Sequence, residues 1–461
     1  MDSAQRGAAI HEQAGLPLQG SSSNAPGSSP RSSLARGELA WLAAVILIAI
    51  GLRILWVAHV NVDPNDGRGD DTVHYHNMAH LLAEGMGYVN WVSRFPTAHW
   101  PPAYPAALAV LYKLFGWHLV LAKGLNIAFA AATVGLTYLI ARRIFDRRVA
   151  HLGALLLAFF PGQIYFSTLV MTETMFGLIF MLVLLLALVW TSQASEARWW
   201  QTLLLGFLVG LGGMVRAEGV FLVFVLVALW ALTVRPWRRV GQYGVLLALG
   251  TALALTPWTV RNAVQLHQFV PLRAYATVVV ARALDPEAVA PAIRLEDIRL
   301  STSEGLEYQV THPWEIPRLV SRRIARLYEN DSDAIFWIQN RANAEPPLTK
   351  EEVGVWRGLA DRYFFAAGAA ALLAAGLSLL RQHRASLVLI VAGAGWTLLF
   401  GFITPDTRFH FPVGLVISVL AAAFLVFIWE GAKRASRWLL TQIRAEYVVP
   451  ARGDPPSDES Q

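Results

Sequence analysis

Long uninterrupted apolar runs are the feature that most limits what this chain can fold into. The run from Leu39 to Val60 is the first of several that are long enough to cross a hydrocarbon core. Such a core is about 30 Å thick and takes roughly 20 helical residues to cross. Hydrophobic residues make up 55% of the 461 positions and charged residues only 15%, which excludes an ordinary soluble globule. Because the alternating pattern of a membrane barrel is absent from the sequence, we expect an all-α polytopic membrane protein.

Ten transmembrane segments are expected from these apolar runs. Their approximate ranges are 39–60, 118–140, 149–165, 174–191, 200–215, 217–234, 241–258, 358–380, 386–404 and 409–430. The stretch 103–116 is apolar but short, so an interfacial or re-entrant helix is expected there instead of another span. No small-residue cleavage site follows the first run, which is therefore expected to be retained.

The charges of the short connections predict how the chain is oriented in the membrane. The connections ARRIFDRR (141–148), RPWRR (235–239), RQHR (381–384) and KRASR (433–437) are basic, whereas those at 160–173 and 404–407 are not. Placing the basic set in the cytoplasm satisfies the positive-inside rule and puts both termini inside. The net charge of +6 then mainly records cytoplasmic loops, and no nucleic-acid partner is expected.

This topology divides the chain into five parts. They are a disordered cytoplasmic tail at 1–38, a membrane module at 39–258 with a first outer loop at 61–117, an outer segment at 259–357, C-terminal transmembrane helices at 358–437 and a cytoplasmic tail at 438–461. Within the outer segment, residues 313–330 place apolar side chains at helical spacing among arginines. That pattern is typical of an amphipathic helix that lies on a membrane.

Ionisable residues collect at the outer ends of the expected spans. They are Asp70, Asp71, His74, His76, His99, Glu173, Arg216, Glu218, Arg261, Asp406 and Arg408. A transporter normally keeps ionisable groups or broken helices near the bilayer midplane. Their position at one interface therefore favours chemistry on a lipid of the outer leaflet.

The stretch GDDTVHYHNMAHLLAEG, which follows the first span, opens with Asp70 and Asp71. In a helix, Asp71 and Tyr75 lie one turn apart, so both can face one cavity. The acids fit an ordinary cap of the helix N-terminus equally well, and spacing does not separate the two interpretations. His76 and His80 have the HxxxH spacing of zinc sites, but zinc is the weaker interpretation without an HExxH glutamate or a third ligand nearby.

Three further motifs supply candidate site residues. The prolines of HWPPAYP force an extended turn, beside which His99 and Tyr104 are candidates for lining a cavity. Glu173 in MTETMF is the one acid of its outer turn. Either it has a cation or metal as a partner, or it stabilises the N-terminus of the helix that follows. Arg216 in GMVRAEG and Arg261 in TPWTVRN suit a lipid phosphate, although arginines at this depth also extend towards headgroups.

In their order and spacing these motifs resemble the membrane-embedded GT-C glycosyltransferases, in particular the family 39-like group. That group contains protein O-mannosyltransferases and the aminoarabinose transferases of lipid A. The resemblance covers about residues 40–265 and rests on Asp71 with Tyr75 and A..L..G.GY, then PPAYP, LFG, MTETMF, the arginine after the fifth span and TPWTVRN. It implies a polyprenyl-phosphate sugar donor, a lipid, glycan or protein acceptor, and a site at the outer face of a bacterial cytoplasmic membrane.

The resemblance also implies roles for individual residues. The catalytic acid of the family corresponds to Asp71, with Asp70 as the alternative in a shifted register, because many members have Asp-Glu where this chain has Asp71-Thr72. Arg216 and Arg261 correspond to basic residues for the donor phosphate. Glu173 corresponds to the acid of the second outer loop, where a divalent metal ion is one option and no organic cofactor is implied. No large soluble domain follows the last span, which argues against an oligosaccharyltransferase.

The expected reaction is an in-line displacement with inversion at the sugar. A polyprenyl phosphate leaves as a weakly basic anion, so the difficult proton belongs to the acceptor, and Asp71 is the expected base. Arginines, or a metal held partly by Glu173, stabilise the leaving phosphate. Two alternatives are a flippase or transporter of a lipid-linked saccharide and a polysaccharide polymerase of another fold.

Overall fold

The computed structural model describes residues 36–66, 71–191, 197–274, 302–340, 344–403 and 405–447, so Asp70 lies outside the described residues. The chain divides into two compact units, Met1–Ala40 and Trp41–Gln461, and the helices from Trp41 onward belong to the second. The described residues are helical apart from turns, loops and one isolated bridge between Val89 and Pro96. The predicted all-α class is confirmed.

In chain order, the described helices are α1 Arg36–His59, α2 Asp71–Ala83, α3 Ala103–Phe115, α4 Leu119–Ile144, α5 Arg147–Ala158, α6 Pro161–Tyr165, α7 Glu173–Thr191, α8 Trp199–Val215, α9 Leu222–Thr233, α10 Trp237–Leu266, α12 Thr302–Thr311, α13 Ile316–Leu327, α14 Asp333–Gln339, α15 Lys350–Leu380, α16 Leu387–Phe402 and α17 Phe411–Tyr447. Short 3-10 turns connect some of these helices. They include η2 Phe166–Thr168, η3 Ala217–Phe221 and η7 Thr407–His410.

Seven described helices are long and apolar enough to cross a membrane: α1, α4, α7, α10, α15, α16 and α17, the last two each with the 3-10 turn before it. An eighth candidate is a broken span, in which α5 and the segment that starts with α6 meet at an angle of 53°. Pro161 begins α6 at this break, where its missing N–H prevents α5 from continuing. Two of the ten expected spans, 200–215 and 217–234, are shorter apolar helices, so the count of ten is not confirmed.

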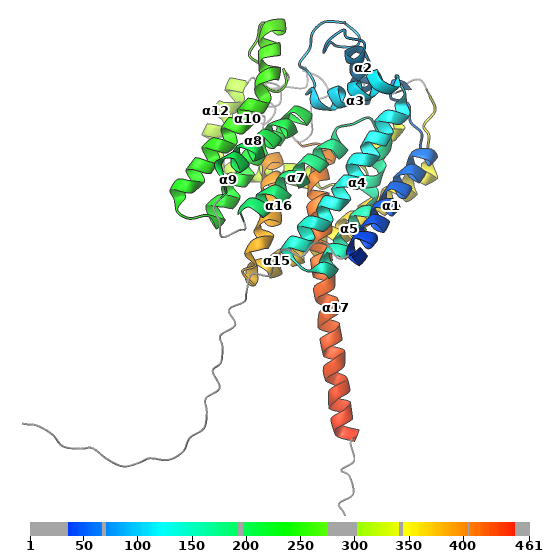
Figure 1. The fold of residues 1–461 in the computed structure, drawn as a ribbon, viewed down its shortest axis with the longest axis vertical. Coiled ribbons are helices and arrows are strands. Elements are labelled where there is room, and N and C mark those ends of the chain that lie inside the picture. Colours follow the sequence, from blue (N-terminus) through cyan, green and yellow to red (C-terminus); the bar gives the residue numbers. More distant parts are fainter. Residues whose placement is uncertain are drawn as a thin grey trace, which may run out of the picture. The chain divides into compact units, whose positions relative to one another are not determined.

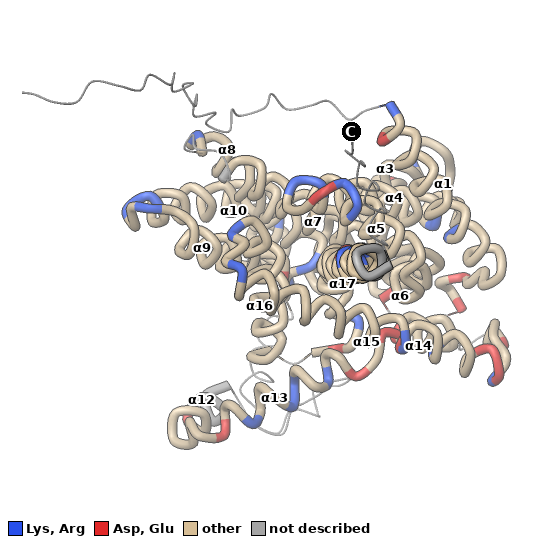
Figure 2. Tube along the Cα trace, turned by 90° about the horizontal axis from the view of Figure 1, so that it is seen from below, with Lys and Arg blue, Asp and Glu red and all other residues tan. Residues whose placement is uncertain are grey.

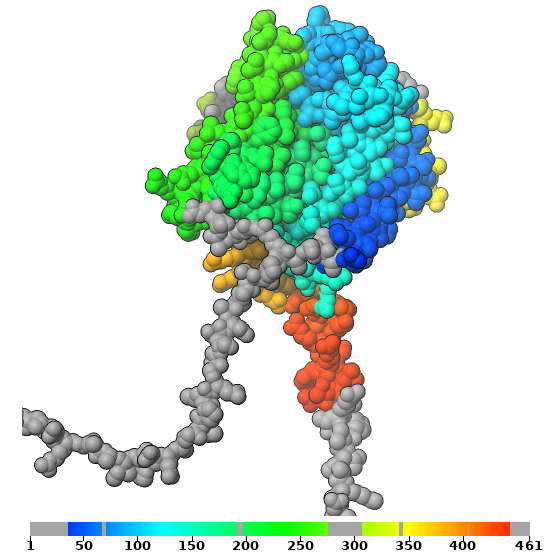
Figure 3. Space-filling model, viewed as in Figure 1, coloured from blue at the N-terminus to red at the C-terminus, as the bar shows by residue number. Residues whose placement is uncertain are grey.

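The first outer loop packs closely on the membrane helices. In Figure 1, α2 and α3 lie together above the upper end of α4, beside the upper end of α10. Tyr75 and Ala79 of α2 share an apolar cluster with Tyr104 and Leu108 of α3 and Ala122 of α4. The space-filling view shows the loop residues seated directly on the α4 residues (Figure 3). This packing fixes the start of α2, and with it Asp71.

Basic residues lie at the helix ends opposite α2 and α3. Figure 2 looks at the molecule from below, and Lys and Arg mark the turns between α4 and α5 and at the start of α10. These turns contain the ARRIFDRR and RPWRR sequences. The separation of basic turns from the first outer loop agrees with the charge asymmetry predicted from the sequence.

The predicted amphipathic helix in 313–330 is present as α13. Its apolar side meets α16, where a Cβ on Gly401 would touch Val320 and Ile324. Arg323 is buried on the same helix and donates to the carbonyl oxygen of Phe402 at 3.0 Å. This helix therefore packs its apolar side on protein, whereas the sequence predicted contact with the membrane surface.

Glycines bring α8 and α10 into close contact. A Cβ on Gly206 of α8 would collide with the carbonyl oxygen of Leu247, and one on Gly250 of α10 would collide with that of Leu203. The hydroxyl of Thr251 crosses the same contact and donates to the carbonyl oxygen of Gly206 at 3.0 Å. Such close backbone approach is typical of small residues in membrane helix pairs.

We expect Gly250→Ala to destabilise the protein by about 1–3 kcal/mol, because the added methyl meets rigid backbone. The matched control is Gly241→Ala on the same helix, where no atom lies within 4 Å of the new methyl. Unfolding of the purified variants in detergent measures the difference. Equal stability of the two variants would contradict the close contact.

Candidate functional site

Asp71, the first residue of α2, forms an ion pair with Arg408 of η7. Its Oδ2 atom lies 2.9 Å from Arg408 Nη2, and its Oδ1 atom accepts a hydrogen bond of 2.9 Å from Trp100 Nε1. The side chain of Asp71 is 30% exposed and that of Arg408 is 13% exposed. Asp71 is thus held on both oxygens and is still reachable from outside the helices.

These neighbours decide the protonation state of Asp71. Burial raises the pKa of its carboxyl, but the Arg408 charge and the hydrogen bonds from Trp100 and Arg408 outweigh burial and lower the pKa to about 2. Asp71 is therefore ionised at neutral pH. In this resting arrangement it is a carboxylate of weak basicity.

A second ion pair lies beside the first. Glu173, the first residue of α7, is 2% exposed, and its Oε1 atom lies 2.7 Å from Arg216 Nη1. Arg216 ends α8 and also donates to the hydroxyl of Thr172 at 3.2 Å. Arg408 Nη1 lies 4.0 Å from the same Glu173 oxygen. Arg408 therefore joins the Asp71 pair to the Glu173 pair.

The alternation of charges continues beyond Arg216. Glu218 of η3 lies 4.0 Å from Arg216 Nε and 3.5 Å from Arg273 Nη2. We call the resulting series the outer ion-pair row; it consists of Asp71, Arg408, Glu173, Arg216, Glu218 and Arg273. Three carboxylates alternate with three guanidinium groups, so each buried charge has an opposite neighbour, as low polarity requires.

Arg408 is the site residue to which the sequence assigned no role, although it was among the ionisable residues expected on the outer face. Side-chain bonds to the 331–333 segment fix the turn that carries it. Thr407 donates to Asp333 at 2.7 Å, and His410 Nε2 lies 2.9 Å from Asp331. The only sequence signal for Arg408 is a cation in the short outer connection TPDTRFH. Its partners Asp71 and Glu173 are too distant in sequence for spacing to reveal them.

The candidate cavity residues occupy two different settings. Tyr75 and Tyr104 are buried and meet edge to face, with ring centres 5.6 Å apart, and the Tyr104 hydroxyl donates to Asn126 at 3.0 Å. His99 is exposed, and its ring lies 4.2 Å from that of Trp100, the residue that holds Asp71. His99 is therefore close to the outer ion-pair row, whereas the tyrosines support the packing beneath α2.

Arg261 lies on α10, away from the other candidates. Its guanidinium donates to the carbonyl oxygens of Thr97, at 2.8 Å, and Tyr88. It also lies over the rings of Tyr88 and Trp258. Among the described residues, no hydrogen bond or ion pair joins Arg261 to the outer ion-pair row, and its observed partners hold the first outer loop against α10. A role at the donor phosphate stays a prediction.

The residues around Glu173 do not fit a metal ion. Over the described ranges, no group of three or more His, Asp or Glu residues is arranged to hold one. Glu173 and Asp71 face guanidinium groups, which occupy the positions a cation would take. His76 and His80 both stack on Trp117, and His76 Nδ1 lies 2.8 Å from the Tyr112 hydroxyl.

Comparison with known proteins places this geometry in a family context. A family model described as dolichyl-phosphate-mannose-protein mannosyltransferase matches residues 99–260. The apo oligosaccharyltransferase of Archaeoglobus fulgidus aligns with a TM-score of 0.55 and 16% identity, covering 88% of this chain and 52% of that one. The same archaeal protein in complex with Zn and sulfate aligns with a TM-score of 0.51 and 17% identity, covering 88% and 51%. The chain has the GT-C fold.

The predicted resemblance to GT-C glycosyltransferases is thereby confirmed, and the chain spans about half the length of the archaeal oligosaccharyltransferase. ArnT of Cupriavidus metallidurans bound to undecaprenyl phosphate aligns with a TM-score of 0.43 and 15% identity, covering 87% of this chain and 80% of that one. A search of curated proteins finds no match. The family match includes Glu173 and Arg216 but not Asp71 or Arg408.

We expect Arg408→Met to destabilise the GT-C fold by about 3–5 kcal/mol, because it leaves Asp71 without its cation partner. Adding Asp71→Asn to this variant should restore part of the loss, which an unfolding titration in mixed micelles measures. The control is Arg434→Gln, which removes an exposed pair with Glu430 and should change stability by less than about 1 kcal/mol. Strictly additive effects of the two substitutions would contradict the pairing.

Proposed function

We propose that this protein is a membrane glycosyltransferase that moves a sugar from a polyprenyl-phosphate donor to an acceptor, with Asp71 as the general base. The observation that carries the proposal is the outer ion-pair row, in which a reachable carboxylate lies beside two arginines. A base for the acceptor and cations for a leaving phosphate are the two groups that such a transfer needs. The archaeal structure reported with a dolichol-phosphate, at a TM-score of 0.50, supports a lipid-phosphate donor.

The proposed transfer is a single in-line displacement with inversion. An acceptor oxygen or nitrogen attacks the anomeric carbon while the bond from that carbon to the phosphate oxygen breaks. The acceptor proton moves to Asp71, and the electron pair of the broken bond stays on the polyprenyl phosphate. Arg216 and Arg408 stabilise the charge that grows on this phosphate, because guanidinium groups bind phosphate oxygens in pairs. Arg261 is a further candidate for the donor phosphate.

For Asp71 to act as a base, its pKa must rise when the donor binds. A carboxyl with a pKa of about 2 accepts a proton poorly at neutral pH. A donor phosphate competes with Asp71 for Arg408, whose guanidinium lies between Asp71 and Glu173. Once Arg408 turns to the phosphate, burial is the largest remaining influence on Asp71 and raises its pKa. Donor binding thus prepares the base.

The location follows from the same proposal. By the positive-inside rule we expect the basic turns on the cytoplasmic side and the outer ion-pair row at the periplasmic face of a bacterial inner membrane. A flippase or transporter of a lipid-linked saccharide is the alternative. The position of the ionisable row at the helix ends favours transfer over transport.

Asp71→Asn should lower sugar transfer by about 100- to 10,000-fold and leave folding intact, because the amide cannot take the acceptor proton. Mass spectrometry of acceptors incubated with purified protein and polyprenyl-phosphate sugars measures the product. Asp66→Asn is the matched control, since it removes an acid from the same outer loop without touching Arg408. Near-normal transfer by the Asp71 variant would exclude it as the base, and absence of product from wild-type protein with every donor would favour the transporter.

If Arg408 moves from Asp71 to the donor phosphate, the pH profiles of kcat/KM and kcat should differ. The profile of kcat/KM reports the free enzyme, in which Asp71 is ionised down to a pKa of about 2, so no acidic limb from Asp71 is expected above about pH 4. The kcat profile reports the donor complex, in which the pKa of Asp71 is higher. Its acidic limb should therefore lie at higher pH. Coincident limbs would show that Arg408 stays on Asp71 throughout.

A further inference from the structure

Arg53 is a buried cation inside a helix that crosses the membrane. It lies on α1, is 1% exposed, and its Nη1 atom donates to the carbonyl oxygens of Ala49 at 3.0 Å and Ala158 at 3.4 Å. The Nε atom of Arg53 has no hydrogen-bond partner. Within the part of the chain that the structure describes, the Arg53 guanidinium forms no ion pair. Its charge is therefore uncompensated by these residues.

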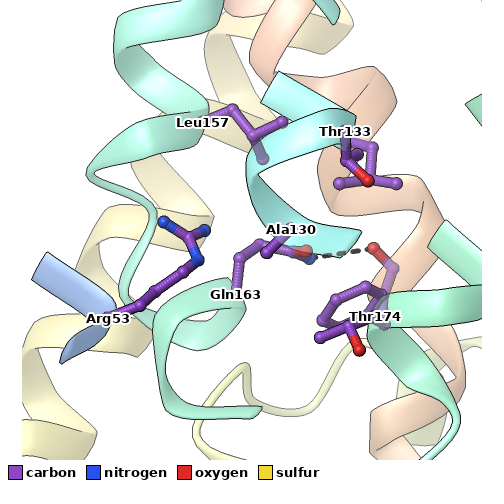
Figure 4. A pocket seen from close by; sticks show the side chains of 8 residues that line it. Arg53, Ala130, Thr133, Leu157, Gln163 and Thr174 are labelled. Atoms are coloured by element: carbon purple, nitrogen blue, oxygen red, sulfur yellow. Dashed lines mark hydrogen bonds between the residues drawn. The ribbon is translucent and has the colours of Figure 1, made fainter. Parts of the chain in front are cut away.

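A small cavity lies beside this guanidinium. Figure 4 shows Arg53 at one side of the cavity, with Gln163 next to it and Thr133 and Thr174 opposite. The remaining lining is apolar and consists of Ala130, Leu157, Phe411 and Leu415. The cavity has a volume of about 10 Å³. The room suits one occupant of about the size of a water molecule.

The other polar side chains at the cavity each donate a hydrogen bond to another group of the chain. Gln163 Nε2 donates to the carbonyl oxygen of Phe411 at 3.0 Å, Thr133 to that of Phe129 at 2.8 Å, and the Thr174 hydroxyl to Asn126 at 2.9 Å. The polar lining group with an unused donor is the Arg53 guanidinium, whose Nε atom has no partner and which carries only donors. The occupant must therefore accept hydrogen bonds.

The charge distinguishes between water and a small anion as the occupant. A water molecule can accept a hydrogen bond from Arg53, but it leaves a full positive charge in the low-polarity interior, where unpaired charges are strongly disfavoured. Arginine does not lose its proton in proteins, so the charge cannot be removed by titration. Oxyanions and carboxylates are larger than the space. We propose that the cavity binds a single monatomic anion, chloride, on Arg53.

The location of the site explains how the anion would act. The carbonyl of Ala158 that Arg53 binds is at the end of α5, where the span breaks. Gln163 connects the cavity to Phe411, which directly follows the turn that carries Arg408. Thr174 is adjacent to Glu173 of the outer ion-pair row. An anion here would hold α1, the break after α5 and the start of α17 together beneath that row.

The test is whether stability depends on the halide. Purified protein is titrated with sodium chloride at constant ionic strength, with gluconate as the balancing anion, and its Tm is measured. We expect Tm to rise by several degrees and to saturate with chloride. Crystals grown or soaked in bromide should show one anomalous peak beside Arg53. A Tm independent of halide together with no bromide peak would mean that the cavity holds water, and would overturn the proposal.

Two variants separate the anion from general salt effects. Arg53→Met keeps much of the side-chain volume and removes the charge, so Tm should lose its chloride dependence. Gln163→Glu keeps Arg53 and supplies an internal carboxylate, so the variant should be equally insensitive to chloride and should lose the bromide peak. This second variant decides the question where Arg53→Met fails to fold. Arg434→Gln, on an exposed surface, should retain the wild-type dependence. Chloride dependence that persists in Gln163→Glu would contradict the site.

Discussion

The ion pair between Asp71 and Arg408 is the interaction on which the outer face of this protein depends. It joins residues 337 positions apart, one at the start of the first outer loop and one beside the last long helix. Arg408 also approaches Glu173, so a single guanidinium makes two carboxylates tolerable in a nearly buried setting. The same turn makes further contacts, because Thr407 and His410 bind Asp333 and Asp331. The outer loop, the 331–333 segment and α17 are therefore held at one point.

Most of the fold was predictable from the sequence because it follows from the lengths of apolar runs. Residues 103–116 are too short for a span and form the short helix α3, as expected. The count of ten is not confirmed at 200–215 and 217–234, where the expected apolar runs form helices that are shorter than the other candidate spans. Arg216 ends α8 in extended backbone, and a 3-10 turn then precedes α9. Run length measures apolarity, whereas span length depends on such local breaks.

The candidate site was predictable in its residue types but not in its pairing. Asp71, Glu173 and Arg216 were identified from motifs, and the structure brings all three together through Arg408. No local pattern predicts a partner from the other end of the chain. Arg261 illustrates the opposite case, since an arginine at a span end looks the same in sequence whether it meets a phosphate or a carbonyl. Its partners are the carbonyl oxygens of Thr97 and Tyr88. These residues belong to the first outer loop, and only the folded structure brings them next to α10.

Charge balance connects the outer ion-pair row to the proposed chemistry. The three carboxylates and three guanidinium groups of the row balance one another before a donor arrives, and Asp406 adds one acid 3.4 Å from Arg408 Nε. A polyprenyl-phosphate sugar brings one negative charge, and transfer leaves the phosphate with a second one. The proton that Asp71 accepts removes one negative charge at the same moment, so the total charge of the site stays constant through the reaction. A base next to the arginines that bind the phosphate therefore keeps the charge balanced in a site of low polarity. Within the part of the chain that the structure describes, Arg53 has no such neighbour, and an anion from outside the chain would supply the missing charge.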